Sequence, residues 1–260
     1  MSKDQDRAFF GHPAGLSTLF FTEMWERFSY YGMRALLIYY MTQSKDVGAL
    51  GMSPEAGGIV WGMFVASAYL LSLPGGWIAD RFLGQRRAIL FGGLGILGGN
   101  ALLAVPTATL FFPGLVLIAL GTGLLKPNVS TVVGQLYSKE DTRRDSGYTI
   151  FYMGINIGAL AAPIACGYLG QNESFRAFMH AHGIDPNWAW HVAFLASAIG
   201  MGFGLVQYVL GYRRMGDAGL HPTVPSEPAK AERDRKVLAI ILGAIVVLGV
   251  VVAVVQPDKE

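Results

Sequence analysis

Seven stretches of predominantly apolar residues, each about twenty residues long, run through this 260-residue sequence. A stretch of that length lets an α-helix cross the roughly 30 Å hydrocarbon layer of a bilayer. Only 15% of the residues are charged, against about 25% in an ordinary soluble domain. The predicted spans are Leu16–Tyr40, Gly57–Ile78, Ala88–Val105, Leu110–Val133, Thr149–Leu169, Ala189–Leu210 and Val237–Val255. The sequence therefore predicts an all-α polytopic membrane protein.

The distribution of lysine and arginine predicts how the chain is oriented. Fourteen of the 20 such residues fall in the amino-terminal segment or in connections on the same side of the membrane. Cytoplasmic loops carry the excess of these residues, so the amino terminus is predicted to be cytoplasmic. No cleavable signal peptide is expected, because the first apolar run is long and others follow it.

One connection differs from the others in length and composition. Residues 211–236 are rich in charge and proline and separate six closely spaced spans from the seventh. We therefore predict an amino-terminal six-helix bundle over residues 1–212, a cytoplasmic linker over 213–236 and one additional transmembrane helix over 237–260. Two-halved secondary transporters have this layout, and a carboxy-terminal half is expected outside this sequence.

The first span carries ionised residues at bilayer depth. Each charge near the bilayer centre costs at least about 2.5–3.5 kcal/mol on insertion scales, so four in one helix indicate a function. At about 100° per residue, the charged and tyrosine side chains share one face, which must look into protein or a water-filled cavity. That face comprises Glu23, Glu26, Arg27, Tyr30, Tyr31 and Arg34.

A purely structural interpretation remains open for part of this face. Arg27 could pair with Glu23 or with Glu26 and simply fix helix packing. That pairing leaves Arg34 unpaired in its own helix. It also leaves unexplained Lys126, which precedes Pro127 within the fourth span.

Depth within the membrane connects residues on different spans. Counted from the cytoplasmic end of each span at about 1.5 Å per residue, five polar or aromatic residues lie roughly 10–15 Å deep. They are Glu23, Glu26, Tyr69, Lys126 and Asn156. A central cavity with fixed cations, carboxylates able to carry a proton, and tyrosine walls would produce this coincidence.

Other patterns are given structural interpretations. The run "GLGILG" over 93–98 has dinucleotide-motif spacing but lies within a span, where small residues let helices approach closely. His180 and His182 are a weak metal signal in a loop predicted to be solvated, and Asn172 opens a glycosylation sequon in the same loop. We expect no metal, no cofactor and no nucleic acid partner.

Three motifs carry a resemblance to a known family. The stretch "EMWERFSYYG" over 23–32 resembles the ExxERFxYYG signature of the proton-dependent oligopeptide transporters (the POT family), a branch of the major facilitator superfamily. The stretch "FYMGINIGALAAP" over 151–163 is similar to that family's second signature. The stretch "GGWIADRFLGQRR" over 75–87 is similar to the superfamily's loop between helices two and three.

The resemblance implies roles for individual residues. It assigns proton coupling to Glu23, Glu26, Arg27 and Lys126. It assigns peptide contacts to Arg27, Tyr30, Tyr31, Arg34, Tyr69, Lys126 and Asn156. The seventh span has no ionisable residue, unlike the family's seventh core helix, so it resembles the first of two lateral helices inserted in bacterial members.

The resemblance thus implies proton-coupled symport of di- and tripeptides by alternating access, in the bacterial inner membrane. The expected partners are peptide, protons, membrane lipid and the missing carboxy-terminal half. An alternative is a related carrier of another small anion such as nitrate. A membrane enzyme is disfavoured because the spans hold no nucleophile–base pair and no metal-ligand cluster. A receptor or structural bundle would not need two glutamates beside Arg27.

Overall fold

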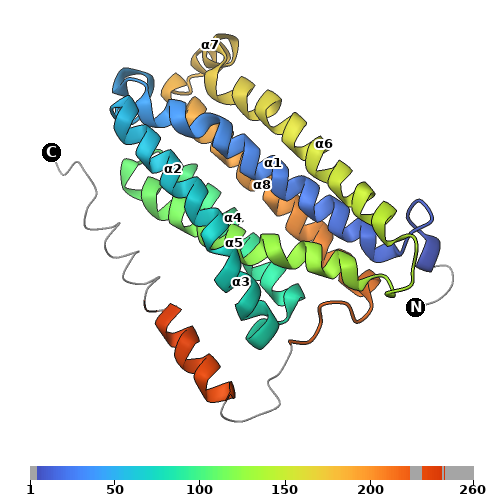
Figure 1. Ribbon diagram of the computed structural model, residues 1–260. Coiled ribbons are helices and arrows are strands. Elements are labelled where there is room, and N and C mark those ends of the chain that lie inside the picture. The colour runs from blue at the N-terminus through green and yellow to red at the C-terminus, as the bar shows by residue number, and fades with distance from the viewer. Residues whose placement is uncertain (1–4, 223–229, 242, 244–260) are drawn as a thin grey trace.

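The computed structural model of the chain, which describes residues 5–222, 230–241 and 243, is a bundle of long α-helices (Figure 1). Within those residues no β-strand forms, and a single β-bridge joins Phe9 to His12. The helices are α1 (Ala14–Thr42), α2 (Pro54–Leu70), α3 (Ser72–Ile78), α4 (Gln85–Leu103), α5 (Phe111–Gln135), α6 (Arg144–Gln171), α7 (Glu173–Ala181) and α8 (Ala189–Leu210). A π-helical turn over Ala79–Leu83 continues α3.

Six of the seven predicted spans coincide with helices, namely α1, α2 with α3, α4, α5, α6 and α8. The 19 residues of α4 give it a length of about 28 Å, close to the hydrocarbon thickness. Among the described residues, four helical stretches are long and apolar enough to cross a membrane by composition alone: Pro54–Leu83, Ala108–Gln135, Arg144–Gln171 and Pro186–Leu210. Helices α1 and α4 do not meet this criterion. The charged residues of α1, and Arg86, Arg87 and Asn100 of α4, make these two helices too polar. Of the seventh predicted span, Val237–Val255, only residues 237–241 and 243 are described, and these are helical.

Glycine lets α4 and α5 touch backbone to backbone. A Cβ placed on Gly121 of α5 would lie 2.5 Å from the Gly92 carbonyl oxygen and 2.7 Å from the Ile96 nitrogen of α4. A Cβ on Gly99 would likewise lie 2.6 Å from the Gly114 carbonyl oxygen. Gly95, within the 93–98 run, also faces Gly121. The packing interpretation of that run is confirmed.

The charged helix α1 is enclosed by α6 on one side and α8 on another (Figure 1). Gly158 of α6 lies against the Met24 carbonyl oxygen, and a Cβ there would come within 3.0 Å of Arg27 Cβ. Gly200 of α8 lies against the Phe28 ring. These close approaches leave α1 without room to turn its charged face toward lipid.

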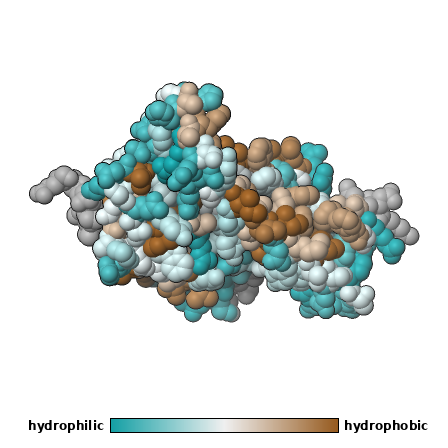
Figure 2. All heavy atoms as spheres, turned by 90° about the horizontal axis from the view of Figure 1, so that it is seen from above, coloured by the Kyte–Doolittle hydropathy of each residue, from teal (hydrophilic) through white to brown (hydrophobic). Residues whose placement is uncertain are grey.

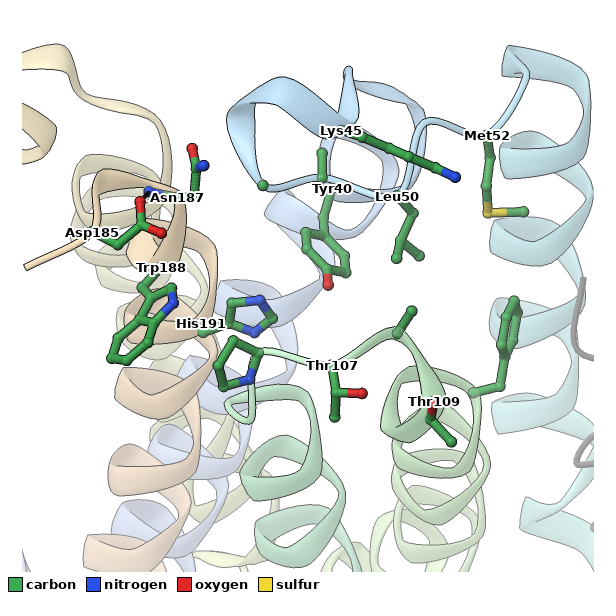
Figure 3. Close-up of a pocket in the computed structure, with 15 residues that line it drawn as sticks. Tyr40, Lys45, Leu50, Met52, Thr107, Thr109, Asp185, Asn187, Trp188 and His191 are labelled. Carbon is green, nitrogen blue, oxygen red and sulfur yellow. Dashed lines mark hydrogen bonds between the residues drawn. The ribbon is translucent and has the colours of Figure 1, made fainter. Parts of the chain in front are cut away.

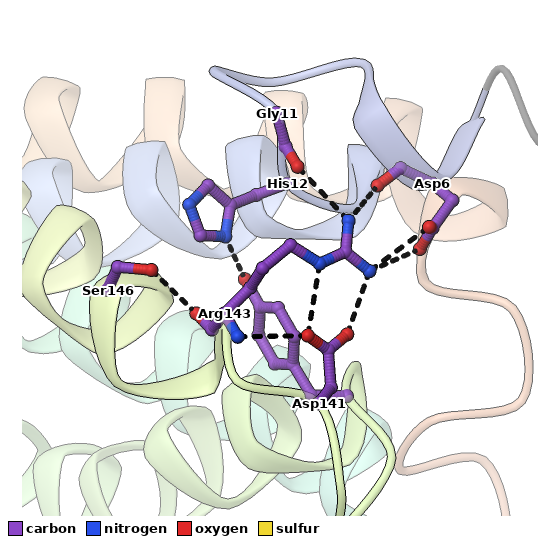
Figure 4. A network of polar contacts seen from close by, with 7 residues as sticks. Asp6, Gly11, His12, Asp141, Arg143 and Ser146 are labelled. Carbon is purple, nitrogen blue, oxygen red and sulfur yellow. Dashed lines mark hydrogen bonds and ion pairs between the residues drawn. The ribbon is translucent and has the colours of Figure 1, made fainter.

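The segment before α1 is bound to the connection between α5 and α6 (Figure 4). Arg143 donates to both carboxylate oxygens of Asp6, at 3.2 and 3.1 Å, and to the Asp6 and Gly11 carbonyl oxygens, each at 3.1 Å. It also binds both carboxylate oxygens of Asp141, at 3.0 and 2.7 Å. His12 Nδ1 lies 3.0 Å from the Tyr137 hydroxyl. We call residues 5–13 the amino-terminal arm.

The chain stays packed against the bundle beyond α8. Arg86 of α4 is buried and donates to the carbonyl oxygens of Tyr212, Gly216 and Ala218. Gln135 Oε1 accepts from the Gly219 nitrogen at 2.6 Å. A further helix covers 230–241, overlapping the end of the predicted linker and the start of the seventh predicted span, and its Asp234 carboxylate lies 3.2 Å from Arg81. Parts of 213–236 are therefore helical or packed, because Arg86 and Arg81 bind carbonyl and carboxylate groups there.

The loop predicted between the fifth and sixth spans contains α7. Asn172 caps this helix, because its Oδ1 accepts from the Ser174 nitrogen at 2.8 Å and from the Phe175 nitrogen at 3.3 Å. Met179 is buried beneath it while Phe178 is exposed. His180 and His182 are exposed, as expected for a solvated segment, but the capping asparagine and the buried methionine make part of that segment a helix.

Large apolar side chains remain open on α2, α3 and α6. They include Ile59, Met63, Leu70, Leu73, Met153, Ile157, Leu160 and Ile164. Figure 2, which looks down on the bundle of Figure 1, shows apolar side chains gathered in patches on the surface. Such patches suit lipid or another helical bundle rather than water.

Candidate functional site

Three charged side chains of α1 form one buried cluster. Arg27 Nε lies 3.1 Å from Glu23 Oε1 and also donates to Glu26 Oε2. The residues Glu23, Glu26 and Arg27 are 3%, 0% and 5% exposed. Both pairings considered from the sequence therefore exist at once. One cation faces two carboxylates, so the cluster carries a formal charge of −1 when all three groups are ionised.

Each member of the cluster keeps one polar atom unpaired. Among the described residues, Glu23 Oε2, Glu26 Oε1 and Arg27 Nη2 have no hydrogen-bond partner. Removing one partner of a buried ion pair is costly because the remaining charge stays uncompensated. A proton on either carboxyl group would bring these three groups to neutrality, so the arrangement is able to take up one proton.

Aromatic rings lie beside the positive charges. The Arg27 guanidinium carbon lies 5.3 Å from the Tyr30 ring centroid. The Arg34 guanidinium carbon lies 6.0 Å from the same centroid and 5.0 Å from that of Trp61 on α2. Cation–π contacts of this kind hold a guanidinium in place without neutralising it. Arg34 thus keeps its charge available for an anion.

An open hollow of about 490 Å³ begins at these rings. Its lining comes from α1, α2 and α6 and consists of Tyr31, Arg34, Ala35, Ile38, Gly58, Trp61 and Pro163. The predicted contact residues Tyr31 and Arg34 are therefore brought together. Sequence reasoning missed Trp61, although an aromatic residue on the span that carries Tyr69 was a signal that could have found it.

Lys126 on α5 meets α2 at Tyr69. Its Nζ lies 4.3 Å from the Tyr69 ring centroid. Tyr69 is itself 59% exposed, so this contact lies toward the open side of the bundle. Lys126 lies close enough to Glu23 for the two charges to interact electrostatically, and Tyr69 lies close enough to Tyr30 for the same kind of interaction. The structure therefore joins Lys126 and Tyr69 to the α1 residues.

Asn156 lies apart from this group. It is exposed on α6, and its Nδ2 donates to the Tyr152 carbonyl oxygen at 3.1 Å, one turn earlier in the same helix. The inward stripe of α6 is instead formed by Gly154 and Gly158, which pack on α1. Depth along the span grouped Asn156 with the cluster, and depth does not specify which face of a helix a residue occupies. The peptide contact that the family resemblance assigns to Asn156 stays a prediction.

A second hollow, of about 450 Å³, lies at the far end of α1 from the amino-terminal arm (Figure 1) and is drawn in Figure 3. It is bounded by the α1–α2 and α4–α5 connections and the start of α8. His191 Nδ1 lies 2.8 Å from the Leu103 carbonyl oxygen, and the His191 ring meets Tyr40 edge-on at 5.5 Å. No sequence pattern pointed to this hollow, because loops far apart in sequence form it. Among the described residues, no group of three metal-ligating side chains occurs here or elsewhere.

Comparison with known proteins places this geometry in a family. The POT family profile matches residues 86–231. The chain is 42% identical over 248 residues to a di-/tripeptide transporter of Lactococcus lactis subsp. cremoris, covering 94% of this chain and 47% of that protein. It is 43% identical over 244 residues to the uncharacterized transporter YclF of Bacillus subtilis strain 168, covering 93% and 46%.

A solved structure agrees with these matches. The crystal structure of a peptide transporter POT in complex with sulfate is 41% identical in sequence, with a TM-score of 0.81 over 96% of this chain and 50% of that one. This chain thus spans about half the length of the relatives it matches. These relatives are transporters, and the helices described above make this a multi-pass membrane protein. The chain belongs to the POT family.

Proposed function

We propose that this chain forms the amino-terminal half of a proton-coupled symporter of di- and tripeptides. The observation that carries the proposal is the buried cluster of Glu23, Glu26 and Arg27, which is one proton short of neutrality. It lies on the same helix as Arg34 and Tyr31, which line a hollow together with Trp61 and so offer a ligand one cation and aromatic rings. The similarity to a di-/tripeptide transporter of Lactococcus lactis supports peptide as the cargo.

In the proposed mechanism, a proton neutralises the cluster while a peptide occupies the space between this bundle and a second one. Tyr31, Arg34, Tyr69 and Lys126 contact the peptide, with Tyr30 behind them and Asn156 contributing from α6. Arg27 is already shared by two carboxylates, so it links peptide binding to protonation. Rocking of the two bundles then exposes the peptide and the proton to the opposite side of the membrane.

We also propose that the protein resides in the bacterial cytoplasmic membrane with its amino terminus in the cytoplasm. The lysine and arginine distribution supports this orientation. The amino-terminal arm and Arg86 would then lie on the cytoplasmic side, and the Figure 3 hollow on the outer side.

The coupling role is tested with Glu23→Gln and Glu26→Gln in the assembled two-half transporter in liposomes. Each amide keeps the shape of the side chain but cannot release a proton. We expect both variants to lose accumulation of labelled dialanine driven by a proton gradient and to retain exchange of dialanine across the membrane. Glu55→Gln, at the exposed start of α2, is the matched control. Undiminished accumulation in both cluster variants would contradict the coupling role.

The substrate contacts are tested through the peptide's own carboxylate, which we place against Arg27 and Lys126. Replacing that carboxylate by an amide removes a hydrogen bond to a charged group, worth on the order of 1.5–3 kcal/mol. We expect dialanine amide to inhibit the uptake of labelled dialanine roughly 10- to 150-fold more weakly than unlabelled dialanine does. Nitrate is included as a competitor, because Arg34 and Lys126 also suit a small inorganic anion. Uptake of labelled nitrate without uptake of labelled dialanine would favour an anion carrier instead.

A further inference from the structure

Two polar atoms in the interior of the bundle lie outside the cluster already described. Asn100 of α4 and Thr122 of α5 are 0% and 3% exposed. Among the described residues, neither Asn100 Oδ1 nor Thr122 Oγ1 has a hydrogen-bond partner. The other end of the Asn100 amide is satisfied, since its Nδ2 donates to the Ile96 carbonyl oxygen at 3.0 Å and to Ser29 Oγ at 3.3 Å. A buried polar atom left unpaired costs about 1–3 kcal/mol, so both atoms call for an account.

The helix geometry brings these atoms to Glu26. Ser29, the partner of Asn100, follows Glu26 by three residues on α1, which puts the two about 60° and one turn apart on the same face. Gly121, next to Thr122, packs against Ile96, one turn before Asn100. Thr122 therefore lies at the level of Glu26 along the bundle.

The direction of Glu26 follows from its neighbour. Arg27 Cβ lies against Gly158, so α1 turns Arg27 toward α6. Glu26 is about 100° away around the helix, on the side where Ser29 meets α4. Helix geometry thus directs the fully buried Glu26 carboxylate toward α4 and α5, and its Oε1 is also without a hydrogen-bond partner among the described residues.

The chemistry of the three atoms restricts what can join them. An amide oxygen and an ionised carboxylate oxygen are both acceptors, so they cannot bond to each other. A protonated carboxyl group is a donor, and a water molecule can bridge two to four polar partners. One water, together with a proton on Glu26, would satisfy Asn100, Thr122 and Glu26 at the same time.

We propose that Asn100 and Thr122 are positioning residues that hold the protonated form of Glu26 through one bridging water. In that state Glu26 donates to the water, and the water donates to Asn100 Oδ1 and to Thr122 Oγ1. When Glu26 releases its proton, the water turns one hydrogen back to the carboxylate, and Asn100 or Thr122 loses a donor. This inference rests on the proposed proton-coupled function and adds residues to its coupling site.

The test compares pH profiles of dialanine accumulation in the assembled transporter. Thr122→Val and Asn100→Leu remove the proposed water partners without touching the peptide hollow. Because one hydrogen bond to the protonated form is lost, we expect the midpoint of accumulation against external pH to move to lower pH by about half to one unit. Exchange of dialanine at equal pH on both sides should stay at the wild-type rate, which a general packing defect would not allow.

Matched controls separate this role from ordinary burial. Thr18→Val removes a hydroxyl of equal burial on α1 that already bonds to the Gly211 carbonyl oxygen, at 3.4 Å. Asn128→Leu removes a buried amide on α5 that already bonds to the Leu124 carbonyl oxygen, at 2.6 Å. Both should keep the wild-type midpoint. If Asn100→Leu fails to fold, the nearly isosteric Thr122→Val decides the question.

The outcomes are distinct. A wild-type midpoint in Thr122→Val or in folded Asn100→Leu would overturn the positioning role while leaving the proposed function intact. Accumulation by the wild type that does not depend on a proton gradient would overturn the proposed function, and this inference with it. A midpoint shift shared equally by Thr18→Val would also overturn it, because any buried hydroxyl would then have the same effect.

Discussion

Two glycines on α6, nine residues apart, have opposite surroundings. A Cβ on Gly158 would collide with the Met24 carbonyl oxygen, whereas a Cβ on Gly167 would meet nothing within 4 Å. We expect Gly158→Ala to lower the free energy of unfolding in detergent by about 1–3 kcal/mol, because α6 must move away from α1. Gly167→Ala should leave it unchanged or raise it by up to about 1 kcal/mol, since alanine favours helix. Thermal unfolding of both variants measures this, and equal losses would contradict the close approach.

At the same scale, sequence reasoning identified side-chain types better than side-chain directions. The charged face of α1 could be predicted because charges in a span must avoid lipid, and the cluster of Glu23, Glu26 and Arg27 follows from their spacing. Asn156 and Trp61 could not be placed, because their directions depend on which faces of α6 and α2 the glycine contacts turn inward. The unpaired oxygen of Asn100 has no signature in sequence at all.

The amino-terminal arm illustrates how one element is held by a few polar contacts. Burial, reinforced by the positive charge of Arg143 and opposed by Asp141, lowers the pKa of His12 below its usual value near 6.5. The folded state thus favours neutral His12. Its contribution to stability is complete above about pH 6.5 and is lost as the pH falls through the lowered value.

We therefore expect the arm to open on mild acidification. Backbone amides of residues 5–13, corrected for the intrinsic effect of pH on exchange, should exchange hydrogen faster at pH 5 than at pH 7.5. The pKa of Asp141 is lowered by its hydrogen bonds from Arg143, so Asp141 stays ionised across that range and does not contribute. His12→Asn should abolish the pH dependence. Equal pH dependence in that variant would exclude His12 as the cause.

Among the elements, the long spans were predictable and the short ones were not. Twenty apolar residues admit few alternatives in a membrane, so six spans were found within a few residues at their ends. The helix α7 depends on the Asn172 cap and on Met179 reaching a buried site, which only tertiary structure reveals. Packing of 211–222 depends on Arg86, a residue 125 positions before the start of that segment.

At the scale of the whole molecule, the open apolar faces of α2, α3 and α6 suggest that a second bundle completes the transporter. We expect this chain alone, reconstituted in liposomes, to insert as a helical protein yet show no saturable dialanine uptake, since alternating access needs two bundles around a shared site. The same liposomes with the two-half protein serve as the control. Saturable uptake by the chain alone would contradict the two-half proposal.

The glycine contact between α4 and α5 has a mechanical consequence. With Gly92 against Gly121 and Gly99 against Gly114, the backbones of α4 and α5 approach each other directly at two levels. The two helices therefore form a rigid pair, because sliding one helix along the other would bring carbonyl oxygens into collision with backbone atoms. In the proposed mechanism these two helices would move together, and bending would occur at a site such as the break between α2 and α3. Asn100 and Thr122 lie on this rigid pair of helices. Their side chains would therefore keep the same positions relative to each other while other helices bend, and Glu26 would meet the same two partners.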